Sequence, residues 1–148
     1  MTIYLASDHA GFHLKEELKT YLASFSYEVE DLGNREYDPN DDYPDFIIPV
    51  AKAVAQDPKN RCGIIMGGSG EGEAIAANRI KGARAVVWYG KNERILTLSR
   101  EHNDANILSI GARFVETEEA KRGVKLWLET PFSEEPRHER RLAKIEDL

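Results

Sequence analysis

The 148-residue sequence contains a single cysteine, no long apolar segment and no excess of positive charge. Because Cys62 has no cysteine partner in the chain, no internal disulfide can form, and we expect a reducing compartment such as the cytoplasm. No apolar stretch approaches the ~20 residues that span a membrane, and the N-terminus lacks the basic region and apolar core of a secretory signal. The net charge of −6 argues against nucleic acid and anionic membrane surfaces as partners. At this length we predict one domain over residues 1–148.

Short apolar runs alternate along the chain with segments of helical periodicity. We predict five strands, at residues 3–6, near Val29, and at 63–66, 85–88 and 107–110. Helices are predicted around residues 14–25, 44–54, 74–78, 95–98 and 117–128, with Thr117 as an N-cap. Pro49 must lie near the first turn of its helix, or the helix kinks there. Continuously apolar strands that alternate with helices are typical of a parallel sheet covered on both faces. We therefore predict an α/β fold, a three-layer α/β/α Rossmann-like sandwich with a five-stranded parallel sheet and a C-terminal helical tail from about residue 131.

A glycine-rich turn, residues 67–73, separates the third predicted strand from a helix of small residues. Such a turn presents free backbone N–H groups and the positive end of the helix to whatever lies above it. Glu71 and Glu73 would repel a phosphate, and the turn has neither P-loop nor dinucleotide-binding spacing. A carboxylate beside oriented N–H donors suits proton abstraction next to a carbonyl. The alternative, that both acids only complement the helix dipole, stays open on this stretch alone.

Several polar side chains follow the predicted strands directly. Asp8 and His9 follow the first strand, residues 69–73 the third, and Arg113 the fifth. Because parallel strands end at the same edge of a sheet, where ligands bind, we expect these residues to share one site. A plain polar turn at Asp8 and His9 is the alternative.

Two further groups of polar residues lie later in the chain. His102 and Asn103 follow a predicted helix and could protonate a ring oxygen and hold a hydroxyl, or simply cap that helix. Arg137 and Arg141 are four residues apart, so both would face one side of a helix and suit a phosphate. A solvated face paired to neighbouring glutamates is the alternative for them, and the subunit whose site they would serve stays open.

A metal site and a cysteine nucleophile both have weak support. Asp8, His9, His102 and His138 offer metal-ligating atoms, but no two of these histidines are spaced i, i+4 and no cysteine accompanies them, so we expect no metal. Cys62 precedes an apolar strand and is expected to be buried.

Six short stretches occur in order along nearly the whole chain: residues 7–11, 42–44, 68–72 with 75–78, 99–106, 111–113 and 137–138. In these stretches the sequence resembles the ribose-5-phosphate isomerase B family, which also contains galactose-6-phosphate and allose-6-phosphate isomerases. The resemblance implies a homodimer, possibly assembled further as a dimer of dimers, with sites at the subunit interface. It implies aldose–ketose isomerisation of ribose 5-phosphate and ribulose 5-phosphate through a cis-enediolate, with no metal or cofactor. A hexose 6-phosphate as substrate stays open, as does a non-catalytic nucleotide-binding or regulatory module.

The resemblance also implies a role for each matching residue. Asp8 and His102 would assist ring opening, and Ser69 with the N–H groups of the turn would hold the enediolate. The expected substrate-binding residues are His9, Tyr43, Gly68, Gly70, Gly72, Asn103, Arg113, Arg137, His138 and Arg141. Of these, His9, Arg113 and the C-terminal His138 and arginines would surround the phosphate, and the neighbouring subunit is expected to supply His102, Asn103 and the C-terminal arginines.

The general base is where this sequence departs from many members of that family. They carry a cysteine base at the position of Gly67, whereas another branch carries a glutamate at the position of Glu73. We therefore assign the base to Glu73 and no role to Cys62.

Overall fold

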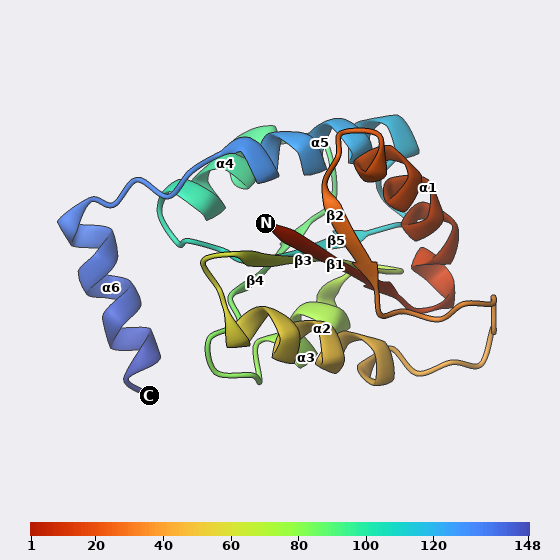
Figure 1. The fold of residues 1–148 in the computed structure, drawn as a ribbon, viewed down its shortest axis with the longest axis horizontal. Helices are drawn as coiled ribbons and strands as arrows, with labels where there is room; N and C mark the ends of the chain where they lie inside the picture. Colours follow the sequence, from red (N-terminus) through yellow and green to blue (C-terminus); the bar gives the residue numbers. More distant parts are fainter.

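The structure, a computed structural model, describes residues 1–148 as five strands, six α-helices and one short 3₁₀ helix (Figure 1). In chain order the elements are β1 (Thr2–Ser7), η1 (His9–Gly11), α1 (Phe12–Ala23), β2 (Glu28–Asp31), α2 (Pro44–Gln56), β3 (Arg61–Gly67), α3 (Glu71–Ala77), β4 (Ala85–Trp88), α4 (Glu93–Glu101), β5 (Ile107–Gly111), α5 (Thr117–Glu129) and α6 (Pro136–Glu146). All five strands lie at the predicted places in the chain. None of the helices is long and apolar enough to cross a membrane.

The five strands form one parallel sheet in the order β2-β1-β3-β5-β4. The predicted α/β fold with a five-stranded parallel sheet is therefore confirmed. From β1 the chain first adds β2 on one side and then β3 on the other, so the direction of winding reverses between β1 and β3. Ligands of open parallel sheets bind at the carboxyl ends of the strands beside such a reversal. We call this edge of the sheet the carboxyl rim.

The helices pack on the sheet through two apolar cores, one on each face. Because successive side chains of a strand point to opposite faces, Ile3 and Leu5 of β1 belong to one core and Tyr4 and Ala6 to the other. Helices α1, α4 and α5 cover the first face, and α2 and α3 cover the second (Figure 1). The chain leaves the strands at the carboxyl rim and continues into helices on either face of the sheet. The loops at this rim therefore lead to both helix layers.

Three local expectations need correction. Pro49 lies in the second turn of α2 rather than near its start. Because proline has no backbone N–H, it cannot donate a hydrogen bond to the carbonyl four residues earlier in the helix. The N-cap of α5 is Glu116, with Thr117 as the first helical residue, and no side chain caps this end. Helix α1 ends at Ala23, so Phe25 falls outside the helix and is exposed.

Helix α6 stands apart from the three layers, on the side away from the point where β1 ends (Figure 1). It is nevertheless fixed near both of its ends. His138, in its first turn, stacks on His102 with ring centroids 4.2 Å apart. Glu146, its last residue, accepts a hydrogen bond of 2.9 Å from Arg84, whose guanidinium also binds Asp104 at 2.9 Å.

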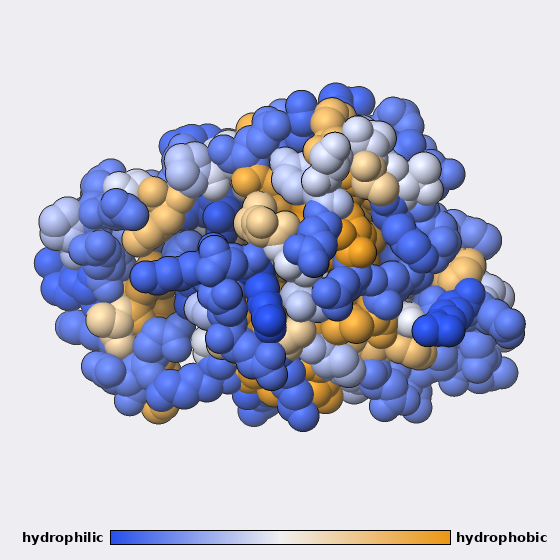
Figure 2. Space-filling view, viewed as in Figure 1, coloured by the Kyte–Doolittle hydropathy of each residue, from blue (hydrophilic) through white to orange (hydrophobic).

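Between α6 and the body of the molecule lies a groove of about 350 Å³. It is lined mainly by apolar side chains, and Figure 2 shows apolar surface in this hollow amid a largely hydrophilic exterior. Leu142 and Ile145, the apolar residues noted in the sequence of the tail, line it from α6.

Candidate active site

The first component of the candidate site is the turn after β1. Asp8 caps η1, since one of its carboxylate oxygens accepts hydrogen bonds from the backbone N–H groups of Ala10 at 2.9 Å and Gly11 at 3.3 Å. Its side chain is thereby held in one orientation, and the residue is buried. Asp8 thus stabilises the turn, as the polar-turn alternative predicted. It also lies at the carboxyl rim, beside the other site residues.

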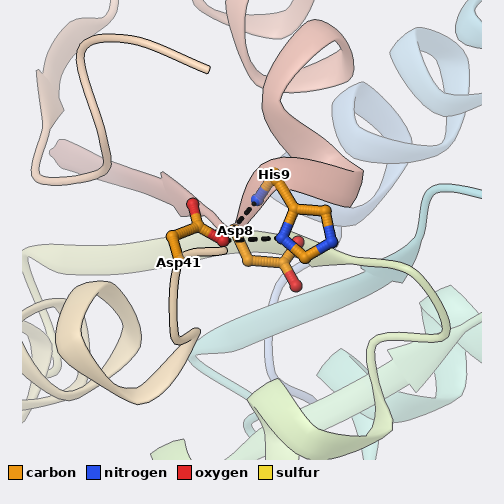
Figure 3. Close-up of side chains that lie close together, drawn as sticks. All are labelled: Asp8, His9 and Asp41. Atoms are coloured by element: carbon orange, nitrogen blue, oxygen red, sulfur yellow. Dashed lines mark hydrogen bonds and ion pairs between the residues drawn. The ribbon is translucent and has the colours of Figure 1, made fainter. Parts of the chain in front are cut away.

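His9 projects from the same turn and contacts Asp41, in the loop between β2 and α2 (Figure 3). Asp41 Oδ1 lies 2.7 Å from His9 Nδ1 and also accepts the backbone N–H of His9 at 3.0 Å. The hydrogen bond to Asp41 raises the pKa of His9 above its ordinary value, and the charge of Asp8 raises it further. The sequence reasoning missed Asp41, whose single available signal was its place directly before the 42–44 stretch.

The glycine-rich turn is held against β5. Ser109 Oγ donates a hydrogen bond of 2.6 Å to the carbonyl of Gly70, and Gly70 has a positive φ of 78°, a backbone conformation that favours glycine. Nothing in the chain covers Ser69, which is exposed at the tip of the turn. The free N–H groups of the turn are therefore presented at the carboxyl rim, at the start of α3.

Glu73 lies in the first turn of α3 and is only 3% exposed, whereas Glu71 in the same turn is exposed. Its carboxylate lies directly over Gly67, so that a Cβ at position 67 would overlap it. Burial raises the pKa of Glu73, and the negative charge of Asp8 adds to the rise. The positive end of α3 would lower that pKa, but burial prevails. Glu73 is therefore a stronger base than an ordinary carboxylate.

Two further predicted residues pack on this turn. A Cβ at Gly68 would lie 3.0 Å from Nη1 of Arg113, which follows β5. A Cβ at Gly72 would lie 2.8 Å from the ring of Tyr43, at the start of α2. The structure thus brings together nine of the predicted site residues at the carboxyl rim: Asp8, His9, Tyr43, Gly68, Ser69, Gly70, Gly72, Glu73 and Arg113.

The remaining predicted residues lie at the opposite end of the sheet within one chain. Helix α4 runs back from the carboxyl rim, so His102 and Asn103 precede the amino end of β5. His138 is buried against His102, and burial lowers the pKa of His138, with His102 lowering it further. Arg141 is exposed, and Arg137 forms an ion pair of 2.8 Å with Glu135, as in the alternative of a solvated, paired face. None of these five residues joins the carboxyl rim of its own chain.

The possible metal ligands considered from the sequence are therefore not assembled, because His102 and His138 lie away from Asp8 and His9. A different trio, Asp8, His9 and Asp41, has ligand-type atoms within 4.8 Å of one another. Its donor chemistry fits a shared proton better than an ion. His9 Nδ1 and Asp41 Oδ1 are already at hydrogen-bond distance, and one oxygen of Asp8 accepts two backbone N–H groups.

Comparison with known proteins covers nearly the whole chain. The family model described as Ribose/Galactose Isomerase matches residues 3–145. Ribose-5-phosphate isomerase B of Mycolicibacterium paratuberculosis is 43% identical over 143 residues, which span 96% of this chain and 87% of that protein. The crystal structure of ribose-5-phosphate isomerase B from Mycoplasma genitalium, with bound ribulose 5-phosphate, is 38% identical and superposes with a TM-score of 0.94 over 99% of this chain and 94% of that one. The enzyme from Clostridium thermocellum is 41% identical, with a TM-score of 0.92 over 99% of this chain and 96% of that one.

Proposed function

The chain belongs to the ribose/galactose isomerase family, and we propose that it is a type B ribose-5-phosphate isomerase, which interconverts ribose 5-phosphate and ribulose 5-phosphate. The observation that carries the proposal is the buried carboxylate of Glu73 beside the free N–H groups of the glycine-rich turn. A base and a set of oxyanion donors on one turn are what proton transfer next to a carbonyl requires. The related enzyme that holds ribulose 5-phosphate has the same fold over nearly its entire length. As the lone cysteine suggests, we place the enzyme in the cytoplasm.

The reaction proceeds on the open-chain sugar. Asp8 and His102 assist ring opening by moving protons at the ring oxygen and the anomeric hydroxyl. Glu73 then takes the proton from C2, the carbonyl oxygen at C1 gains negative charge, and a cis-enediolate forms. Ser69 and the N–H groups of the turn stabilise that oxygen, and loss of one such donor typically costs ~10²–10³ in rate. Glu73 returns the proton to C1 while the hydroxyl proton at O2 passes to O1, which leaves the ketone at C2.

Glutamate takes the place of the cysteine base found in many members of this family. The support is geometric, because the carboxylate of Glu73 fills the space that a side chain at position 67 would occupy. A cysteine at position 67 and a glutamate at position 73 therefore deliver a basic atom to the same point above the turn, and only one of them fits.

A second copy of the chain completes the site. His102, Asn103, Arg137, His138 and Arg141 lie at the amino end of their own sheet, so they reach a carboxyl rim only in a partner. Helix α6 stands away from its own body and exposes Arg141 to solvent, as a segment that packs on a neighbour would. In this arrangement the tail from about residue 131 packs on the partner, and its arginines bind the phosphate that His9 and Arg113 approach from the other side.

Solvent-deuterium exchange tests the reaction and the base together. The protein is incubated in D₂O with ribose 5-phosphate, allose 6-phosphate and galactose 6-phosphate in parallel, and label at C2 is followed by NMR. We expect exchange fastest with the pentose. Glu73→Gln should abolish exchange yet still bind the substrate, and the matched variant Glu71→Gln should behave as the parent. Near-normal exchange by Glu73→Gln would remove that residue as the base, and faster exchange with a hexose would change the substrate.

Subunit mixing tests the shared site. Glu73→Gln and His102→Gln should each be inactive alone, because each lacks one half of every site. If the two halves come from different subunits, mixed and re-equilibrated samples regain activity, since a mixed dimer contains one intact site. No recovery on mixing, with mixed dimers demonstrated by mass spectrometry, would place both residues in one subunit's site.

A further inference from the structure

Asp41 makes a two-point contact with a single residue of the candidate site. Its Oδ1 atom accepts the backbone N–H of His9 at 3.0 Å and lies 2.7 Å from His9 Nδ1 (Figure 3). Its Oδ2 atom accepts a hydrogen bond of 2.8 Å from the side-chain amide of Asn34, which is itself buried. Both carboxylate oxygens are thus engaged, and the His9 ring is fixed relative to its own backbone.

The burial of Asp41 favours a charged partner, so its contact with His9 is an ion pair. The side chain of Asp41 is only 5% exposed, and a buried carboxylate is costly unless a positive charge or several donors compensate it. No lysine or arginine pairs with Asp41 in the structure, so a protonated His9 is the cation available to it. The hydrogen bond that Asn34 donates to the other carboxylate oxygen of Asp41 brings no positive charge.

The remaining charges around His9 are of both signs. Asp8 favours a protonated His9 and Arg113 disfavours it, while the hydrogen bond to Asp41 is the strongest influence and raises the pKa of His9. The ring of Tyr37 lies 6.4 Å from the His9 ring, edge-on. The balance favours an imidazolium with Nδ1 facing Asp41 and Nε2 facing away from it, free of any partner in the chain (Figure 3).

We propose that Asp41 is a positioning residue that keeps His9 protonated and aims its Nε2–H at the phosphate of the substrate. This proposal rests on the proposed function, because a sugar phosphate supplies the anion that His9 and Arg113 would bind together. Asp41 itself does not touch the substrate. Its contribution is to favour the cationic form of His9 and to orient it, since charge-assisted hydrogen bonds to phosphate are about twice as strong as neutral ones.

The direct test is an NMR titration of the histidine rings in the full-length protein without substrate, with His9 assigned through His9→Gln. In the parent, His9 should titrate above the ordinary value of 6.5. Asp41→Asn should lower the pKa of His9, and Asp41→Glu, which keeps the charge, should restore part of the rise. Asp38→Asn is the matched control, because it removes a carboxylate from the same loop that binds only the backbone of Asn40. A parent His9 that titrates at or below 6.5 overturns the proposal without any variant, whatever the substrate proves to be.

Kinetics separate a positioning role from a merely structural one. Asp41→Asn should raise KM for ribose 5-phosphate about tenfold near pH 7, as expected for loss of one charge-assisted contact, and leave kcat within about twofold. Below pH 6 the KM values should converge, because His9 then binds a proton without help. In a His9→Gln background Asp41→Asn should have no further effect on KM. A KM penalty that is independent of pH, or that persists without His9, contradicts the proposal.

Discussion

Replacing Gly67 with alanine tests the position of the proposed base most directly. A Cβ at this position would overlap the carboxyl group of Glu73, including its carbon and both oxygens. Because Glu73 is buried, its carboxylate cannot simply swing into solvent without breaking the packing of α3 on β3. The substitution should therefore push the base away from the substrate and leave the rest of the carboxyl rim in place.

The size of the effect follows from the kind of overlap. Inserting one methyl group into a packed site costs about 1–3 kcal/mol of stability, which a domain of ordinary stability tolerates. A displacement of a catalytic group by about 1 Å costs roughly 10²-fold in rate. We therefore expect Gly67→Ala to fold, to bind ribose 5-phosphate with KM within a fewfold of the parent, and to lose about 10²-fold in kcat.

The assay is steady-state isomerisation alongside urea unfolding, so that activity and stability are measured on the same sample. The double variant Gly67→Cys, Glu73→Ala removes the glutamate base at position 73 and introduces a cysteine base at position 67. Its activity should exceed that of Glu73→Ala alone and should rise with pH towards ~8.5, the ordinary thiol pKa. Full activity in Gly67→Ala, or a double variant no better than Glu73→Ala at every pH, would refute the shared location of the two bases.

Two other predictions concern buried titratable groups. Burial raises the pKa of Glu73 above 4.5, so the folded state holds its proton more tightly than the unfolded state, and the parent loses stability as pH rises from about 4.5 through the folded pKa. Glu73→Gln should accordingly be more stable than the parent to urea at pH 7 and should lose this advantage below pH 4.5; an advantage constant with pH would contradict the assignment. Cys62 is 4% exposed and burial raises its pKa to about 12, so iodoacetamide should modify it slowly at pH 7.5 without loss of activity. Inactivation that ribose 5-phosphate prevents would count against this expectation.

The strands and the composition of the carboxyl rim were predictable because both depend on local sequence. A continuous apolar run such as residues 63–66 fits a strand buried on both faces. Asp8, Glu73 and Arg113 each follow a strand closely, so parallel strands alone were enough to place them together. The order of β4 and β5 in the sheet has no comparable local signal, because it depends on which strands pair in space.

The contacts that sequence reasoning missed join residues far apart in the chain. Asp41 is 32 positions from His9 and lies in a polar loop without periodicity. The stack of His102 on His138 depends on the path of the chain from α5 to α6, which no pattern in the charged tail specifies. The N-cap of α5 was predicted one residue too late, at Thr117, because helix ends are the least well-defined part of a helix.

The double attachment of α6 affects how two chains would meet. With His138 stacked at one end and Glu146 bound to Arg84 at the other, the helix and the loop of His102 form one preassembled arm rather than a loose tail. In the proposed dimer, association would order few groups that are not already ordered, so most of the contact free energy would remain to hold the two subunits together. Cutting either attachment would convert the arm into a tether, and the penalty would fall on the dissociation constant of the subunits while each isolated chain kept its fold.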